Sequence, residues 1–200
     1  MKSIYKQVHI MCDLETLGTG DCPPVFQISA KAFDIEDGEI VDEFDMLADI
    51  TKMDNIEGKT LAWWLNTNKE LLTQLVNDGK TAGNTEKHVI ECFVMWINRL
   101  QRYVSDKTHI FLWGNGVLFD NRIIKAKCDQ YGIEYPIFYR NDMDMRTVME
   151  VAAMKRGLSG QCEYRNLLEK TGTAHNATDD VINQINILVM AVKELAYGIQ

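Results

Sequence analysis

Two carboxylates follow an apolar run near the start of the chain. The stretch HIMC, residues 9 to 12, leads directly into Asp13 and Glu15. Alternate residues of a strand point to the same face, so the two acids are expected to project together. Neighbouring carboxylates repel one another unless a cation lies between them, and hard oxygen ligands suit Mg²⁺ or Mn²⁺. Taken alone, the pair is equally typical of a strand end in solvent.

Two further segments carry residues of the same chemistry. Asp120 follows the apolar segment HIFLW and the turn GNGVLF, near the start of a helical pattern. In AHNATDD, His175 precedes a helix expected to begin near Ala177, and Asp180 falls in its first turn, so both could face one cleft. The ordinary roles of such residues are helix capping and compensation of the helix dipole.

The hydrophobic periodicity indicates which elements must position these side chains. Strand patterns are expected at residues 7–14, 25–33, 40–47, 109–113 and, in YPIFY, 135–139. Helical patterns are expected at residues 60–76, 84–104, 119–131, 144–154, 163–170 and 177–196. A meander of three antiparallel strands followed by alternating helices and strands predicts a layered α/β fold.

The composition narrows the class of protein. A length of 200 residues with 46% hydrophobic content predicts one domain spanning residues 1–200. Five dispersed cysteines without a C-x-x-C pair, and no signal-peptide or membrane-spanning stretch, predict a reduced, cytoplasmic protein that does not enter a membrane. A net charge of −8 argues against a protein that coats long nucleic acid, but less against a metal-dependent enzyme that acts on chain ends.

The order of these acids and the histidine resembles a known family. D-x-E on a strand, Asp after a central strand, and H-x-x-x-x-D opening a late helix are similar to the DEDDh exonucleases of the DnaQ-like, ribonuclease H-like superfamily, over roughly residues 7 to 195. The strings TLAWWLN, WGNGVLFDNRII, YRNDMDMRTVMEV and AHNATDDVINQ resemble phage Dex-type and exonuclease VIII-like 3′–5′ exonucleases. The chain departs from the general pattern at Gly116, where an Asn is usual and this sequence has Asn115 one place earlier.

The resemblance implies a fold and a set of catalytic roles. The fold is a ribonuclease H-like three-layer α/β architecture, with a central mixed five-stranded sheet flanked by helices. Asp13 would bridge two divalent ions, Mg²⁺ or Mn²⁺, Glu15 and Asp180 would hold the ion that activates water, and Asp120 would position its neighbours. His175 would be the general base, which requires a neutral imidazole, so we expect activity to rise with pH between roughly 6 and 8.

The resemblance also implies contacts with the substrate. Thr16, Leu17 and Gly18 would line the pocket of the terminal nucleotide, with Leu17 against a base. Neighbouring helical residues lie about 100° apart, so one of Trp63 and Trp64 is expected in the core and the other, taken as Trp64, against the substrate. Phe119 is expected either to stack on a base or to pack beneath the acids. Arg146 is expected either to reach a phosphate or to form an ion pair with Asp142 or Asp144.

The leading hypothesis is a metal-dependent 3′–5′ exonuclease that releases nucleoside monophosphates from single-stranded nucleic acid, with DNA ahead of RNA. An oligoribonuclease-like phosphodiesterase on short RNA is the alternative within enzymes. An inactive nucleic-acid-binding module of the same fold is the alternative outside them. An aspartyl phosphatase is disfavoured because Leu17 stands where its D-x-D-x-T motif needs Thr. The sequence leaves the oligomeric state open, a homodimer included.

Overall fold

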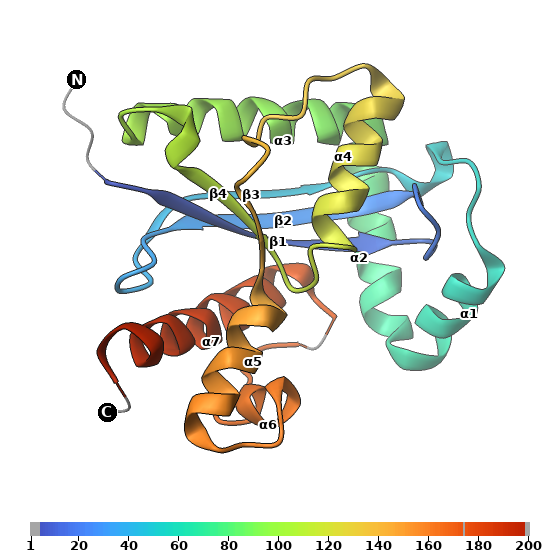
Figure 1. Ribbon diagram of the computed structural model, residues 1–200. Coiled ribbons are helices and arrows are strands. Elements are labelled where there is room, and N and C mark those ends of the chain that lie inside the picture. The colour runs from blue at the N-terminus through green and yellow to red at the C-terminus, as the bar shows by residue number, and fades with distance from the viewer. Residues whose placement is uncertain (1–4, 174, 199–200) are drawn as a thin grey trace.

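The computed structural model describes residues 5–173 and 175–198 and is built around one mixed sheet of five strands (Figure 1). The strands lie in the order β3-β2-β1-β4-β5. Strands β1 to β3 are antiparallel neighbours, whereas β4 is parallel to β1 and β5 is parallel to β4. Their bounds are β1 Val8–Thr16, β2 Val25–Phe33, β3 Ile40–Leu47, β4 Ile110–Gly114 and β5 Asp142–Asp144.

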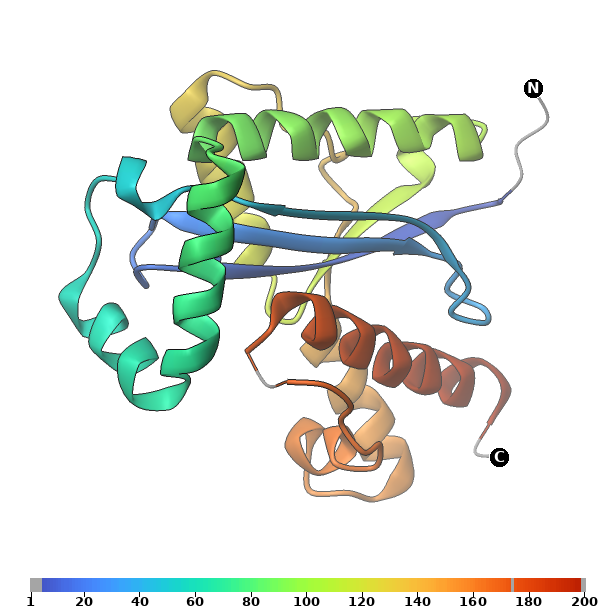
Figure 2. The same ribbon diagram turned by 180° about the vertical axis from the view of Figure 1, so that it is seen from behind.

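Helices cover both faces of this sheet. Helices α3 and α4 lie on one face, and α5, α6 and α7 lie on the other (Figures 1 and 2). Helices α1 and α2 flank the end of the sheet where β1 finishes. The bounds are α1 Gly58–Thr67, α2 Lys69–Ala82, α3 Glu86–Arg99, α4 Asp120–Tyr131, α5 Met145–Arg156, α6 Gln161–Arg165 and α7 Ala177–Tyr197. Short 3-10 turns occupy Ile50–Lys52, Leu100–Tyr103 and Lys107–His109.

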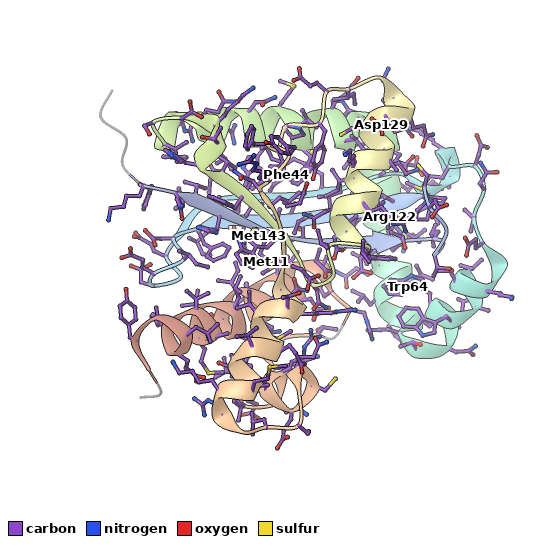
Figure 3. The ribbon with its side chains drawn as sticks, in the orientation of Figure 1. Met11, Phe44, Trp64, Arg122, Asp129 and Met143 are labelled. Carbon is purple, nitrogen blue, oxygen red and sulfur yellow. The ribbon has the colours of Figure 1, made fainter. Side chains whose placement is uncertain are left out.

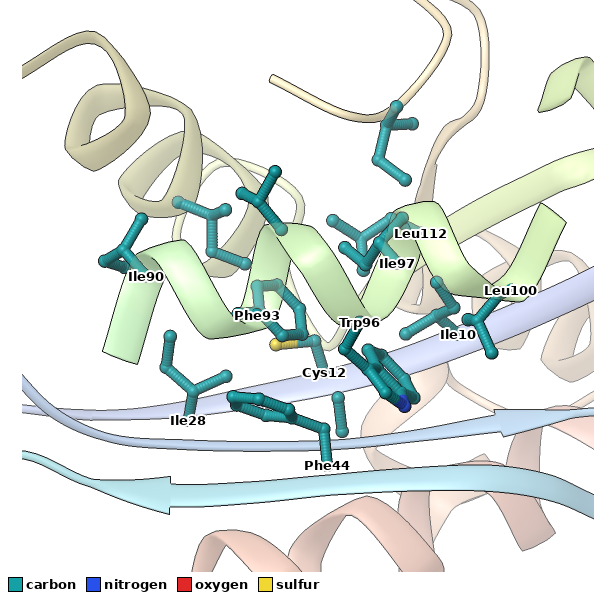
Figure 4. Close-up of a cluster of buried hydrophobic side chains, with 14 of the residues drawn as sticks. Ile10, Cys12, Ile28, Phe44, Ile90, Phe93, Trp96, Ile97, Leu100 and Leu112 are labelled. Atoms are coloured by element: carbon teal, nitrogen blue, oxygen red, sulfur yellow. The ribbon is translucent and has the colours of Figure 1, made fainter. Parts of the chain in front are cut away.

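The alternation of β1 divides its side chains between the two layers. Ile10 and Cys12 join the hydrophobic cluster beneath α3 and α4, where Phe93 and Trp96 of α3 pack onto the sheet (Figure 4). Met11 points to the opposite face, into the cluster formed with α5 and α7 (Figure 3). Since Asp13 and Glu15 have the same parity as Met11, the strand presents both acids to the layer that contains α7.

A third cluster fixes α1 and α2 against the end of the sheet. Trp64 of α1 is 1% exposed and packs edge-on against Phe26 of β2, with ring centroids 5.7 Å apart. Its indole N–H donates to the backbone carbonyl of Thr16 at 3.3 Å. Leu17 lies fully buried in the same cluster. This packing anchors the turn that follows the two acids.

The predicted three-layer fold with a mixed five-stranded sheet is confirmed, one predicted strand is wrong, and two predicted helices differ in their bounds. The helix expected over 60–76 is divided into α1 and α2 because the Asn68 side chain caps the start of α2. The segment 135–139 is not a strand, because its side chains make separate contacts instead of pairing with the sheet. The Tyr135 hydroxyl donates a hydrogen bond to Asp142, and Ile137 packs in the hydrophobic core. The fifth strand is instead Asp142–Asp144. The helix expected over 163–170 is α6, Gln161–Arg165.

None of the helices in the described residues has the length and apolar character needed to span a membrane.

Candidate active site

Three carboxylates from two elements meet at the end of β1. Asp13 and Glu15 come from the strand, and Asp180 comes from the first turn of α7. Ligand oxygens of the three lie within 4.8 Å of one another. Helix α7 begins where it does because the Asn176 side chain accepts a hydrogen bond from the Thr178 N–H, and this places Asp180 over the strand.

Two hydrogen bonds orient the cluster. Gln184, one helical turn after Asp180, donates from Nε2 to Oδ1 of Asp13 at 2.8 Å. The backbone N–H of His175 donates to Oδ2 of Asp180 at 3.1 Å. Gln184 is 8% exposed, and among the described residues its Oε1 has no hydrogen-bond partner. The carboxylates are therefore held in place by side chains and backbone that carry no charge of their own.

Asp120 is the fourth acid and lies beside the group of three. It is 4% exposed at the first position of α4, which begins directly after the turn that leaves β4. Its charge raises the pKa of Asp13, which shows that the two carboxylates are close. Hydrogen bonds from the backbone at Gly116 and Leu14 support its ionised form.

The electrostatics of the four acids fit a site for hard cations. Burial, and then the charge of neighbouring acids, hold the pKa values of Asp13 and Glu15 well above their usual range. Burial raises the pKa of Asp180, and it raises the pKa of Asp120 to about 7. Among the described residues no Lys or Arg forms an ion pair with any of them. The charge of Arg146 lowers the pKa of Asp120 from a longer distance. Clustered oxygen donors that repel one another and have no ion-paired Lys or Arg in the described part of the chain suit divalent ions such as Mg²⁺ and Mn²⁺.

His175 lies in the turn before α7, beside these acids. Its backbone has a φ of 63°, an uncommon left-handed conformation for a residue other than glycine. Its imidazole meets the indole of Trp63 edge-on at 5.1 Å between ring centroids. Trp63 is 46% exposed, so the pair stands at the surface. The turn and the indole together set the orientation of the imidazole.

The four acids and His175 line one cleft of about 480 Å³. Its lining also includes Arg146 of α5 and Arg165 of α6. Within the described residues Arg146 forms no ion pair with Asp142 or Asp144. Those acids bond elsewhere: Asp142 accepts from Asn121 and Tyr135, and Asp144 caps α5 and accepts from the Val117 N–H. Arg146 is therefore available to a ligand.

The structure corrects two of the expected substrate contacts. Leu17 is fully buried and Trp64 is 1% exposed, because both belong to the cluster that anchors α1. Of the tryptophan pair, it is Trp63 that faces solvent beside His175. Thr16 and Gly18 form one turn, in which the Thr16 hydroxyl donates to the Gly18 carbonyl. Phe119 lines the cleft and also packs against the main core, and its two expected roles stay predictions.

Three residues of the site were missed by the sequence analysis or assigned elsewhere. Gln184 had a readable signal, since a residue four positions after Asp180 lies on the same face of a helix. Trp63 was one of two candidates that the sequence could not separate. Arg165 comes from a separate short helix, and no spacing in the sequence connects it to the acids.

The fold of the chain is similar to that of several solved nucleases. The nuclease domain of 3′hExo, described as a DEDDh family member and bound to rAMP, superposes with a TM-score of 0.62 at 14% identity, covering 96% of this chain and 94% of that one. Cell-death related nuclease 4 (CRN-4) gives 0.70 at 16% identity over 96% of this chain, and E. coli exonuclease I in complex with a dT13 oligonucleotide gives 0.66 at 17% over 94%. The chain spans 65% of the CRN-4 chain and 41% of the exonuclease I chain.

The family profile described as 3′-5′ exoribonuclease Rv2179c-like domain matches residues 8–192, and the chain belongs to this family. A search of curated proteins gave no match. The expected resemblance to the DEDDh exonucleases is thus confirmed, and the chain is placed in a family of 3′–5′ exonucleases. The narrower likeness to phage enzymes stays a prediction.

Proposed function

We propose that this protein is a metal-dependent 3′–5′ exonuclease that hydrolyses the terminal phosphodiester bond of single-stranded nucleic acid and releases nucleoside monophosphates. The observation that carries the proposal is the group of Asp13, Glu15 and Asp180, whose oxygens lie within 4.8 Å of one another in a cleft that His175 also lines. Asp120 lies close enough to Asp13 to raise its pKa. These are the residues that the family pattern requires, brought together from three separate parts of the chain.

The four carboxylates would hold two divalent cations, Mg²⁺ or Mn²⁺. Bound cations at such a cluster supply charge neutralisation for the phosphoryl oxygens and lower the pKa of water. Asp13, Glu15 and Asp180 would hold the ion nearest the nucleophile, and Asp13 and Asp120 would hold the other. Gln184 keeps the Asp13 carboxylate aimed at this position by donating a hydrogen bond to it.

His175 would act as the general base. Its imidazole lines the cleft that contains the acids, and its backbone N–H is bonded to Asp180. Proton transfer requires a base within hydrogen-bond reach of the attacking water, and the edge of Trp63 limits how far the ring can turn away. The neutral imidazole would take the proton of the water as the bond from the water oxygen to phosphorus forms, while the bond from phosphorus to the 3′ oxygen of the upstream nucleotide breaks.

Single-stranded RNA is the proposed substrate class. The matching family is described by exoribonuclease activity, and this favours RNA over the DNA that the sequence reading placed first. The exposed ring of Trp63 supplies a surface on which a base can stack, whichever sugar carries it. The sugar is thus the part of the proposal that needs a direct measurement.

The test compares 5′-labelled RNA, DNA and duplex of about 30 nucleotides, each with Mg²⁺, Mn²⁺ or a chelator. We expect stepwise shortening of single-stranded RNA from its 3′ end with either metal and none with chelator. Asp13→Ala should abolish the activity while circular dichroism stays unchanged. Cleavage confined to di- to tetranucleotides would support the oligoribonuclease-like alternative. Binding of RNA without cleavage, under every metal condition, would support the inactive module and refute the proposal.

A further inference from the structure

Two arginines on the wall of the cleft are held by the same turn. Arg165, the last residue of α6, donates from Nη2 to Oδ1 of Asn115 at 2.5 Å. Arg146 lies against the next residue: a Cβ atom at Gly116 would stand 3.3 Å from Cζ of the guanidinium. Asn115 and Gly116 form the turn between β4 and α4, which begins at Asp120. One turn therefore brings both guanidinium groups to the edge of the acid cluster.

The two arginines lie near acids without forming ion pairs with them: the charge of Arg146 lowers the pKa values of Asp120 and Asp144, and the charge of Asp180 raises the pKa of Arg165. Burial and the charge of Arg146 lower the pKa of Arg165, as expected for two cations held close together. Neither forms an ion pair with Asp or Glu within residues 5–173 and 175–198. Four arginines outside the cleft do have such partners: Arg99, Arg102, Arg122 and Arg156. The half-buried guanidinium of Arg165 lies unfavourably close to the guanidinium of Arg146. An anion that binds from outside the protein would therefore stabilise the pair.

The position of the pair indicates which anion it receives. Figures 1 and 2 show α1 on one side of the start of α7, and α5 and α6 on another. Trp63 of α1 contacts His175, which precedes α7, whereas Arg146 and Arg165 belong to α5 and α6. A strand whose terminal nucleotide lies toward Trp63 and whose scissile phosphate lies at the acids would pass its next phosphate toward the arginines.

We propose that Arg146, Arg165 and Asn115 form a subsite for the phosphate immediately 5′ of the scissile phosphodiester. This inference rests on the proposed exonuclease function. A guanidinium is planar and matches the oxygens of a phosphate with paired hydrogen bonds, while the Asn115 amide fixes the orientation of Arg165. The subsite makes an upstream phosphate part of substrate recognition. A dinucleotide with a 5′ hydroxyl lacks that phosphate, and the same dinucleotide with a 5′ phosphate has it.

The experiment measures kcat/KM for the two dinucleotides, pNpN and NpN, with Mn²⁺. We expect the wild-type protein to prefer pNpN by about 10- to 100-fold, the range for charge-assisted hydrogen bonds. Arg165→Gln should remove most of this preference by lowering kcat/KM for pNpN about 10-fold more than kcat/KM for NpN. Arg146→Gln, at an exposed position, should act in the same direction. Arg140→Gln is the matched control, because Arg140 is exposed, lies outside the cleft and stacks on Tyr139.

Each other result overturns the inference in an identifiable way. Equal wild-type rates on pNpN and NpN would show that no upstream phosphate is recognised. An equal loss on both dinucleotides in Arg165→Gln and Arg146→Gln would assign the arginines to the scissile phosphate or to folding. If neither dinucleotide nor the longer RNA is cleaved by the wild-type protein, the proposed function fails and the subsite fails with it.

Discussion

Asp120→Asn should stabilise the metal-free protein at alkaline pH. The carboxyl is 4% exposed and its pKa is raised to about 7, mainly by burial, whereas an unfolded chain gives Asp a pKa of about 3.9. Below about pH 4 the group is protonated in both states and has no effect on stability. Between about pH 4 and 7 only the unfolded state ionises, so stability falls by about 1.4 kcal/mol per pH unit, and above pH 7 the loss is constant.

The full penalty above pH 7 is on the order of 4 kcal/mol, and it is smaller at pH 5, where the folded-state carboxyl is still protonated. Asn cannot ionise and avoids this penalty, while its carbonyl oxygen can still accept the backbone hydrogen bonds from Gly116 and Leu14. The advantage of the variant over wild type should therefore grow between pH 5 and pH 8. The assay is urea unfolding in chelator at both pH values, analysed by linear extrapolation.

Asp129→Asn is the matched control, because Asp129 is an exposed acid near the end of the same helix (Figure 3). Its variant should follow wild type at both pH values. Mn²⁺ at 100 times its Kd should narrow the advantage of Asp120→Asn at pH 8, since it stabilises the folded wild type by about 2.7 kcal/mol and the variant binds it less well. An advantage of Asp120→Asn in chelator that fails to increase from pH 5 to pH 8 would refute the electrostatic account of this site.

Three further predictions concern residues around the acids. His175→Ala should lower kcat by about 10² to 10⁴ and flatten the pH–rate profile between roughly pH 6 and 8; a profile identical in shape to wild type would remove His175 as the base. Trp63→Ala should lower kcat/KM with little change in Tm, whereas Trp64→Ala should cost about 3–5 kcal/mol of unfolding free energy, and the reverse pattern would contradict the burial of Trp64. Gln184→Ala should weaken Mn²⁺ binding about 10- to 100-fold by calorimetry, because Asp13 loses its donor; unchanged affinity would show that Gln184 only packs.

The acids could be placed from the sequence because local rules govern them. Strand alternation puts Asp13 and Glu15 on one face, and the N-terminus of α7 puts Asp180 in a first turn beside His175. Among the confirmed strands, β1 and β2 are long and buried along almost their whole length. These features depend on residues close to one another in the chain.

The errors arise where tertiary packing decides between equivalent local readings. Adjacent tryptophans must point in different directions, but only the position of β2 determines that Trp64 meets Phe26 and that Trp63 stays exposed. The apolar segment 135–139 reads as a strand, yet the sheet edge is occupied by the polar β5, whose Asp142 receives hydrogen bonds from Asn121 and Tyr135. A sequence pattern shows which segments are hydrophobic, but it does not show which of two neighbouring segments pairs with the edge of the sheet.

Asp13 and Glu15 lie in the paired strand β1, whereas His175 lies in a turn, so the acids and the histidine differ in their local stability. β1 pairs with β4 over Val8 to Cys12 and with β2 from His9 onward, and Glu15 is still paired with Gln27. Amide protons of such a central strand exchange with solvent through global unfolding, whereas those of a turn such as that of His175 exchange through local fluctuations. A local opening of this turn would leave Asp13 and Glu15 in position. Native-state hydrogen exchange should therefore distinguish molecules in which only the turn of His175 has opened from molecules in which the turn and the strand with Asp13 and Glu15 are both intact.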